Sequence, residues 1–310
     1  MRVNVSIPDM ARNGRSGVPT GQIQRAGRAS VLLAGTLLMT VTLMNAQVTR
    51  LSTNKGVEFG IVGMKPTSPR PTLFIFASTF ERTLSDPNFN RMGMILRRER
   101  GVLLVSMDLP AHGGDRRAGE PEELNGWAFR IAKGEDPITP FTRKASEVLS
   151  FLIDEGYTAP NEVLASGTSR GGFIALHFTA EEPRIRGVVA FAPVTDLTVL
   201  SEFHALGTNA LARSLAAARL SGKIAGRPVW LCIGNNDERV GTDHAIAFSR
   251  RLVEEAVVRG VAADVTLEVN PAVGHTLFPD AHDNAARWVM SHLLAVQQTG
   301  PGPHNGSDSH

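Results

Sequence analysis

The segment Gly-Thr-Ser-Arg-Gly-Gly, residues 167–172, places a serine among glycines at the junction of two apolar runs. The run before it is typical of a buried strand, and the run after it has helical spacing. A serine on a sharp strand-to-helix turn is lifted clear of the sheet, and only small residues fit two positions to either side of it. Gly167 and Gly171 occupy those positions. We therefore interpret Ser169 as a nucleophile rather than as part of a phosphate-binding or structural turn.

A serine hydroxyl is a weak nucleophile at neutral pH unless a histidine takes its proton and a carboxylate orients that histidine. Asp237 follows the apolar run PVWLCIG, and His275 follows the run DVTLEVN. The order Ser169, Asp237, His275 is the one expected when all three groups lie at strand ends of one α/β sheet. We prefer Asp237 to the adjacent Glu238 as the acid because of its shorter side chain and its position.

Four other residues have competing interpretations. His112, in DLPAHGGD, is the rival general base, but its loop follows the wrong strand. His177 falls within the helix after the nucleophile, where packing or surface exposure is expected. Cys232 lies inside an apolar run, which predicts a buried thiol rather than a nucleophile. Arg170 has two open interpretations: it contacts a carboxylate of the substrate, or it pairs with an acid on a neighbouring helix.

Short β-branched runs alternate with helical patterns from about Leu51, which is typical of crossover units and a mostly parallel sheet. Seven runs read as strands: 57–64, 71–77, 102–108, 161–167, 186–193, 228–234 and 264–270. Helical patterns cover 90–101, 141–157, the segment after Ser169, 243–260 and 281–298. This pattern predicts a single doubly wound α/β domain over residues 47–298.

Two segments, 112–140 and 194–226, are longer than crossover connections usually are. Both leave from the carboxyl edge of the expected sheet, where ligands bind in open α/β folds. We interpret them as a small lid. Trp127 and Phe129 in the first segment, together with Phe80, are our candidates for the substrate pocket.

The segments GTSRGG, FAPVTDL, NNDERVGTDHAIAFSRRL and GHTLF resemble the α/β-hydrolase superfamily, and in particular its dienelactone-hydrolase and prolyl-oligopeptidase-like branch. The resemblance covers roughly residues 57–297 and implies a sheet of about eight strands with helices on both faces. The turn at Ser169 directs the backbone N–H of Arg170 toward an oxyanion. The resemblance places the second oxyanion donor at the backbone of Thr79, although the usual His-Gly pair is replaced by ASTF at 77–80.

The first 46 residues differ in charge from the rest of the chain. They hold five arginines and one aspartate, followed by an uncharged apolar stretch from Ser30 to Gln47. Removing them from the 32 basic and 30 acidic residues leaves 27 and 29, a formal charge of −2, which argues against a nucleic-acid-binding face. We expect residues 1–46 to be an export signal that directs the protein to the periplasm or the medium, with an uncleaved membrane anchor as the alternative. Residues 299–310 are expected to be a disordered tail.

Together these features predict a serine hydrolase that cleaves a carboxylic ester through an acyl-enzyme intermediate. The expected partner is a small-molecule ester, and no metal or organic cofactor is implied. A peptidase that acts on short peptides is the alternative within the same chemistry. A non-catalytic binding protein that kept the fold is the alternative of another class.

Overall fold

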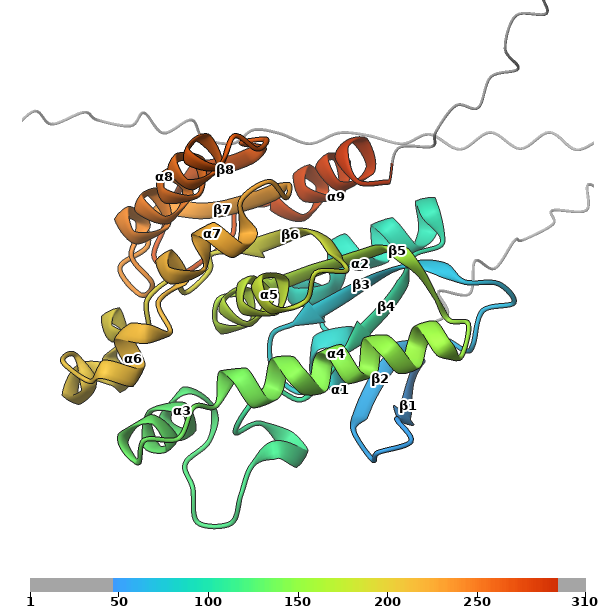
Figure 1. Ribbon diagram of the computed structural model, residues 1–310, viewed down its shortest axis with the longest axis horizontal. Coiled ribbons are helices and arrows are strands. Elements are labelled where there is room, and N and C mark those ends of the chain that lie inside the picture. Colours follow the sequence, from blue (N-terminus) through green and yellow to red (C-terminus); the bar gives the residue numbers. More distant parts are fainter. Residues whose placement is uncertain (1–46, 295–310) are drawn as a thin grey trace, which may run out of the picture. The chain divides into compact units, whose positions relative to one another are not determined.

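An eight-stranded sheet runs through residues 47–294, the part of the chain that the computed structural model describes (Figure 1). Its strand order is β1-β2-β4-β3-β5-β6-β7-β8. β2 pairs antiparallel with β1 and with β4, and every other neighbouring pair is parallel. The strands are β1 (Val48–Ser52), β2 (Glu58–Val62), β3 (Arg70–Phe76), β4 (Leu103–Ser106), β5 (Thr158–Thr168), β6 (Ile185–Phe191), β7 (Val229–Asn236) and β8 (Val265–Val273).

The central strands could be predicted from the sequence because they are buried. β4 is buried along its whole length, and β3 is buried from Thr72 onward. Strands that are covered by helices on both faces carry near-continuous apolar runs. β1 was not among the predicted strands, because its sequence VTRLS has only two apolar residues, and the strand lies partly exposed at the edge of the sheet.

Helices lie on both faces of the sheet, as the doubly wound pattern predicts (Figure 1). One face is packed by residues of α4, α5 and α8, including Val148, Phe173 and Phe248. The other is packed by α2 and α9, through residues such as Leu96 and Val289. The α-helices are α1 (Phe80–Ser85), α2 (Pro87–Arg100), α3 (Glu123–Ala132), α4 (Ile138–Asp154), α5 (Arg170–Glu181), α6 (Ala210–Ser214), α7 (Ser221–Ile224), α8 (Thr242–Arg259) and α9 (Ala281–His292).

Helix boundaries follow local capping signals. α2 begins three residues earlier than expected, because the Asp86 carboxylate accepts a hydrogen bond from the Asn88 amide and Pro87 suits the first helical position. It ends at Gly101, whose φ of 65° lies in the left-handed region that favours glycine. Within residues 47–294 there is no helix with the length and apolarity needed to cross a bilayer.

The two long segments fold into short helices. Residues 112–140 contain the 3₁₀ turn η1 (Gly113–Asp115), α3 and the start of α4. Residues 194–226 contain α6, α7 and the 3₁₀ turns η2 (Leu197–Val199), η3 (Ser201–Leu206) and η4 (Ala217–Leu220). α3 packs against η3, so the two segments contact each other. The predicted signal segment 1–46 and tail 299–310 lie outside the described residues.

Candidate active site

Ser169 sits between the end of β5 and the start of α5 with a backbone φ of 55° and ψ of −118°. A positive φ is uncommon for a residue with a side chain, and such strain is concentrated at functional sites. The turn is tight because the chain comes close to itself. A Cβ on Gly167 would overlap the carbonyl group of Gly171, and a Cβ on Gly171 would overlap the carbonyl group of Phe76. The two glycines are therefore required by backbone contact.

The structure brings Ser169, His275 and Asp237 together. His275 Nδ1 lies 2.8 Å from Asp237 Oδ2, and His275 Nε2 lies 2.9 Å from Ser169 Oγ. An ionised carboxylate can only accept hydrogen bonds, so Nδ1 donates to Asp237 and Nε2 is left to accept the serine proton. This is the relative arrangement of nucleophile, base and orienting acid that acyl transfer by a serine requires.

The Asp237 carboxylate is held from its other side as well. Its Oδ1 accepts hydrogen bonds from the backbone amides of Arg239, at 3.0 Å, and Val240, at 3.2 Å. Its side chain is fully buried, whereas that of His275 is 28 % exposed. The neighbouring Glu238 is exposed and does not contact the histidine. The choice of Asp237 over Glu238 thus agrees with the geometry.

Arg170 pairs with an acid on a neighbouring helix, which is one of its two expected roles. Its Nη1 lies 3.2 Å from Glu123 Oε2, and its Nε donates a hydrogen bond of 3.1 Å to the Ala77 carbonyl. Neither the Arg170 amide nor the Thr79 amide donates to an acceptor within residues 47–294. Arg170 lines the cavity at Ser169, whereas Thr79 does not. The oxyanion role of both amides stays a prediction.

The rival residues have other structural roles. His112 is buried, and its Nδ1 donates to the Pro110 carbonyl at 2.8 Å. Burial lowers the pKa of His112, and burial also lowers the pKa of His177 to about 4. His177 Nε2 donates to the Leu215 carbonyl. Cys232 is buried, which raises the pKa of its thiol. Among the described histidines, only His275 contacts Ser169.

A cavity of about 420 Å³ opens beside Ser169 and His275. Six of the residues that line it were not among the predicted site residues: Arg82, Phe89, Glu123, Leu124, Arg239 and Leu277. They come from helices or loops that follow the carboxyl ends of three strands, β3, β7 and β8, or from the segment 112–140. The position of Arg239, two residues after the acid, was the one signal that could have identified a member of this set.

The three aromatic residues proposed for the substrate pocket do not line this cavity. Phe80 is buried against Gly60 of β2. Trp127 is fully buried, packs at a tilt against Phe173 and donates to the Pro110 carbonyl. Phe129 lies beneath the ammonium group of Lys133, 4.0 Å from its ring centre. The prediction from residue type was wrong here because each ring faces the core or another part of its own helix.

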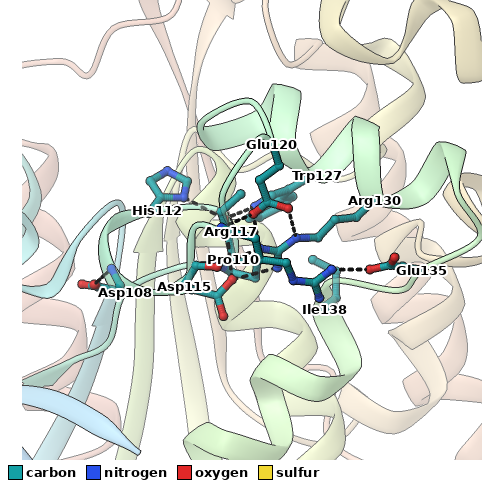
Figure 2. Close-up of polar contacts among 12 residues, drawn as sticks. Asp108, Pro110, His112, Asp115, Arg117, Glu120, Trp127, Arg130, Glu135 and Ile138 are labelled. Atoms are coloured by element: carbon teal, nitrogen blue, oxygen red, sulfur yellow. Dashed lines mark hydrogen bonds and ion pairs between the residues drawn. The ribbon is translucent and has the colours of Figure 1, made fainter.

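A buried ion-pair network holds the segment 112–132, as Figure 2 shows. The Arg130 side chain is only 5 % exposed and binds both Oε atoms of Glu120, with Nε 3.0 Å from Oε2 and Nη2 2.5 Å from Oε1. Its Nη1 also lies 2.7 Å from Asp115 Oδ2. This network fixes the loop that precedes α3, and α3 begins with Glu123 and Leu124 at the cavity.

The described residues contain no group of three or more His, Cys, Asp or Glu side chains placed to hold a metal ion. The side chains that line the cavity include the Ser169 hydroxyl, the His275 imidazole, three guanidinium groups and one carboxylate, that of Glu123. These groups suit nucleophilic attack and stabilisation of negative charge.

Comparison with solved structures identifies the fold. Acetyl xylan esterase 1 from Thermoanaerobacterium sp. JW/SL YS485 matches with a TM-score of 0.57 at 18% identity, over 81% of this chain and 85% of that one. TT1662 from Thermus thermophilus matches with a TM-score of 0.56 at 21% identity, over 82% of this chain and 100% of that one. The strand order and the turn at Ser169 agree with these matches. The chain has the α/β-hydrolase fold.

Two further comparisons concern its place among α/β-hydrolases. The sequence model of the prolyl oligopeptidase family matches residues 143–294, just under half of the chain, and this stretch contains Ser169, Asp237 and His275. Dipeptidyl peptidase 4 from Porphyromonas gingivalis matches with a TM-score of 0.58 at 13% identity, over 79% of this chain and 35% of that one. No curated protein sequence matches the chain. This α/β-hydrolase is an enzyme of the serine hydrolase type, with both esterases and peptidases among its structural neighbours.

Proposed function

We propose that this α/β-hydrolase cleaves a carboxylic ester through an acyl-enzyme intermediate. The observation that carries the proposal is the chain of two hydrogen bonds from Asp237 through His275 to Ser169, 2.8 Å and 2.9 Å long. A base in hydrogen-bond contact with the nucleophile, and itself oriented by a buried carboxylate, is ready to take the serine proton.

In the proposed first half of the reaction, Ser169 Oγ attacks the ester carbonyl carbon and its proton passes to His275 Nε2. The carbonyl oxygen becomes an oxyanion, which the amides of Arg170 and Thr79 stabilise by hydrogen bonding. When the tetrahedral intermediate collapses, the C–O bond to the leaving group breaks. The leaving alkoxide takes the proton from His275, departs as an alcohol and leaves an acyl group on Ser169.

The second half repeats these steps with water. His275 takes a proton from a water molecule, which attacks the acyl carbon and forms a second oxyanion. Collapse breaks the bond to Ser169 Oγ, which recovers its proton from His275, and the carboxylic acid leaves. Throughout, Asp237 holds the histidine in the tautomer with a proton on Nδ1 and stabilises the imidazolium. The hydrogen bonds from the Arg239 and Val240 amides keep the carboxylate from turning away.

A peptidase that acts on short peptides is the second candidate, favoured by the match to the prolyl oligopeptidase family over residues 143–294. The charges at the cavity favour an ester over a peptide with a free amino terminus. Arg82, Arg170 and Arg239 all line it, and Glu123, the one carboxylate among the lining residues of 47–294, is already paired with Arg170. A positively charged amino terminus would meet net repulsion there.

The test of the proposal is a hydrolysis screen of 4-nitrophenyl esters of increasing acyl length beside aminoacyl anilides. Ester cleavage that exceeds anilide cleavage by more than the intrinsic reactivity difference supports an esterase, and the reverse supports a peptidase. Ser169→Ala should lose both activities, down to about 10³–10⁴-fold over the rate in water. A folded wild-type protein that shows neither turnover nor reaction with a fluorophosphonate probe would be a binding protein.

A further inference from the structure

The cavity beside Ser169 carries more positive than negative charge. Three arginines line it, Arg82, Arg170 and Arg239, whereas Glu123 is the one carboxylate among the described lining residues. Burial lowers the pKa of Arg170, and the charges of Arg82 and Arg239 act in the same direction. Arg82 and Arg239 are therefore both near enough to Arg170 to act on its charge.

Two of these arginines are neutralised by carboxylates of the chain. Arg239 makes a two-pronged contact with Glu202, with Nη1 2.8 Å from Oε2 and Nη2 2.5 Å from Oε1. Arg170 pairs with Glu123 at 3.2 Å and donates to the Ala77 carbonyl. Both guanidinium groups thus have their charge balanced before any substrate enters.

Arg82 differs from the other two. It is exposed, and no carboxylate of residues 47–294 lies within ion-pair distance of it. Its guanidinium carbon lies 5.7 Å from the ring centre of Phe89, which also lines the cavity. A cation over an aromatic face is held there by the ring quadrupole. Arg82 therefore presents an uncompensated charge at the cavity that holds Ser169.

We propose that the substrate is an ester with a free carboxylate, and that Arg82 is a specificity-determining residue that binds this carboxylate. The inference rests on the proposed ester hydrolysis and adds the charge of the substrate to it. A guanidinium group matches a carboxylate in a planar, bidentate contact. Phe89, Leu124 and Leu277 supply apolar surface for the carbon chain between the carboxylate and the ester.

The experiment compares matched pairs of substrates that differ in one carboxylate. Mono-4-nitrophenyl adipate against 4-nitrophenyl hexanoate places the charge in the acyl group. The pair 4-acetoxybenzoate and its methyl ester places it in the leaving group. The readout is the ratio of kcat/KM for the charged substrate to kcat/KM for the neutral one. After correction for the uncatalysed rates, the wild-type ratio should exceed one in at least one pair. The pair that shows this preference identifies whether the carboxylate belongs to the acyl group or to the leaving group.

Three variants test the assignment. Arg82→Met should lower the ratio about fivefold to tenfold, the range expected for loss of one charge-assisted contact. Arg98→Met is the matched control, because Arg98 is exposed on α2 and lines a different cavity, so its ratio should equal that of the wild type. Glu123→Gln removes the balancing charge from Arg170 and should raise the ratio, because a second guanidinium group at the cavity then attracts the carboxylate.

The outcomes separate this inference from the proposed function. A ratio of one or below in both pairs, or a ratio that Arg82→Met leaves unchanged, overturns the carboxylate assignment. In that case, Ser169-dependent cleavage of the neutral esters still supports the esterase. If neither charged nor neutral esters are cleaved and the fluorophosphonate probe does not react, the proposed function fails and this inference fails with it.

Discussion

The role of Asp237 as the orienting acid follows from the contacts of its two carboxylate oxygens. One carboxylate oxygen accepts from His275, and the other accepts from two backbone amides. Its side chain is fully buried, so the contact with the histidine is shielded from water. Glu238 is exposed and adjacent in sequence, which makes it a matched control for the same chemistry.

Asp237→Asn should lower kcat on the order of 10⁴-fold, because an amide that donates to Nδ1 favours the wrong histidine tautomer. Glu238→Gln should leave kcat within about twofold of the wild type, as expected of an exposed substitution that breaks no contact. Steady-state hydrolysis of a neutral ester checks both variants. If the two effects were exchanged, the acid would have to be reassigned to Glu238.

At the scale of elements, α5 lies unusually close to the ends of β3 and β5. A Cβ at Gly171 would overlap the backbone carbonyl of Phe76, and backbone atoms in the middle of the sheet have nowhere to move. We expect the same approach to direct the amide at the start of α5 toward the oxyanion. Packing of the helix and the geometry of the site therefore depend on one contact.

Gly171→Ala should lower the free energy of unfolding by about 2–3 kcal/mol through this overlap. Gly207→Ala is the control, since the nearest atom to its added Cβ is 3.7 Å away and its φ is −58°. That substitution should keep stability or raise it slightly, through a less flexible unfolded chain. Urea denaturation of the two variants and the wild type measures the difference, and equal midpoints for all three would contradict the close-approach argument.

The network around Arg130 gives the segment 112–132 a pH-dependent stability (Figure 2). Hydrogen bonds from Arg130 hold the pKa of Glu120 at about 2, below its ordinary value of 4.5. A carboxyl group whose pKa is lower in the folded state than in the unfolded state stabilises the folded protein. This contribution is complete at pH values above the unfolded-state pKa, and it is lost as the pH falls through the folded-state pKa. The relevant window is thus about pH 4.5 down to about pH 2.

Thermal unfolding between pH 6 and pH 2 should therefore show a loss of stability in which Glu120 contributes on the order of 2–3 kcal/mol. Glu120→Gln should start from a lower Tm at pH 6, because the buried Arg130 loses a charged partner, and should lose less on acidification. The exposed Glu122, which pairs with Arg116 at the surface, offers Glu122→Gln as a control with a profile close to the wild type. Parallel profiles for Glu120→Gln and the wild type would exclude the network as the source.

At the scale of the whole molecule, the charge is divided along the sequence. Residues 1–46 hold five of the 32 basic residues and one of the 30 acidic ones, so the remainder has a formal charge of −2. The first described strand, β1, starts at Val48 and pairs with β2, and the Gln47 carbonyl accepts a hydrogen bond from the Gly63 amide. The first described strand thus follows directly after the segment that we propose as an export signal.

Cleavage before Gln47 should give an exported product with a complete sheet and an isoelectric point well below the 9.0 of the full sequence. Intact-mass analysis of protein from the periplasm or medium of an expressing bacterial host reads the new terminus. Full-length chain in the membrane fraction would favour the anchor instead. Full-length chain in the cytosol would mean that the apolar stretch is neither signal nor anchor.

The sequence by itself determined the features that depend on neighbours along the chain. Buried strands such as β3 and β4 could be read because continuous apolar runs reflect cover on both faces. The turn at Ser169 could be read because its glycines are a local steric requirement. The order of Ser169, Asp237 and His275 followed once each was placed after its strand, since parallel strands bring their carboxyl ends to one edge.

Only the tertiary structure decided which side chains meet across that edge. The pairing of Arg170 with Glu123, the uncompensated Arg82 and the burial of Phe80 and Trp127 all depend on residues far apart in sequence. Residue type alone could not place the aromatic rings, because an aromatic side chain suits a core as well as a pocket. Side-chain direction is set by the packing of neighbouring elements, and that information is carried by contacts between segments rather than by any one of them.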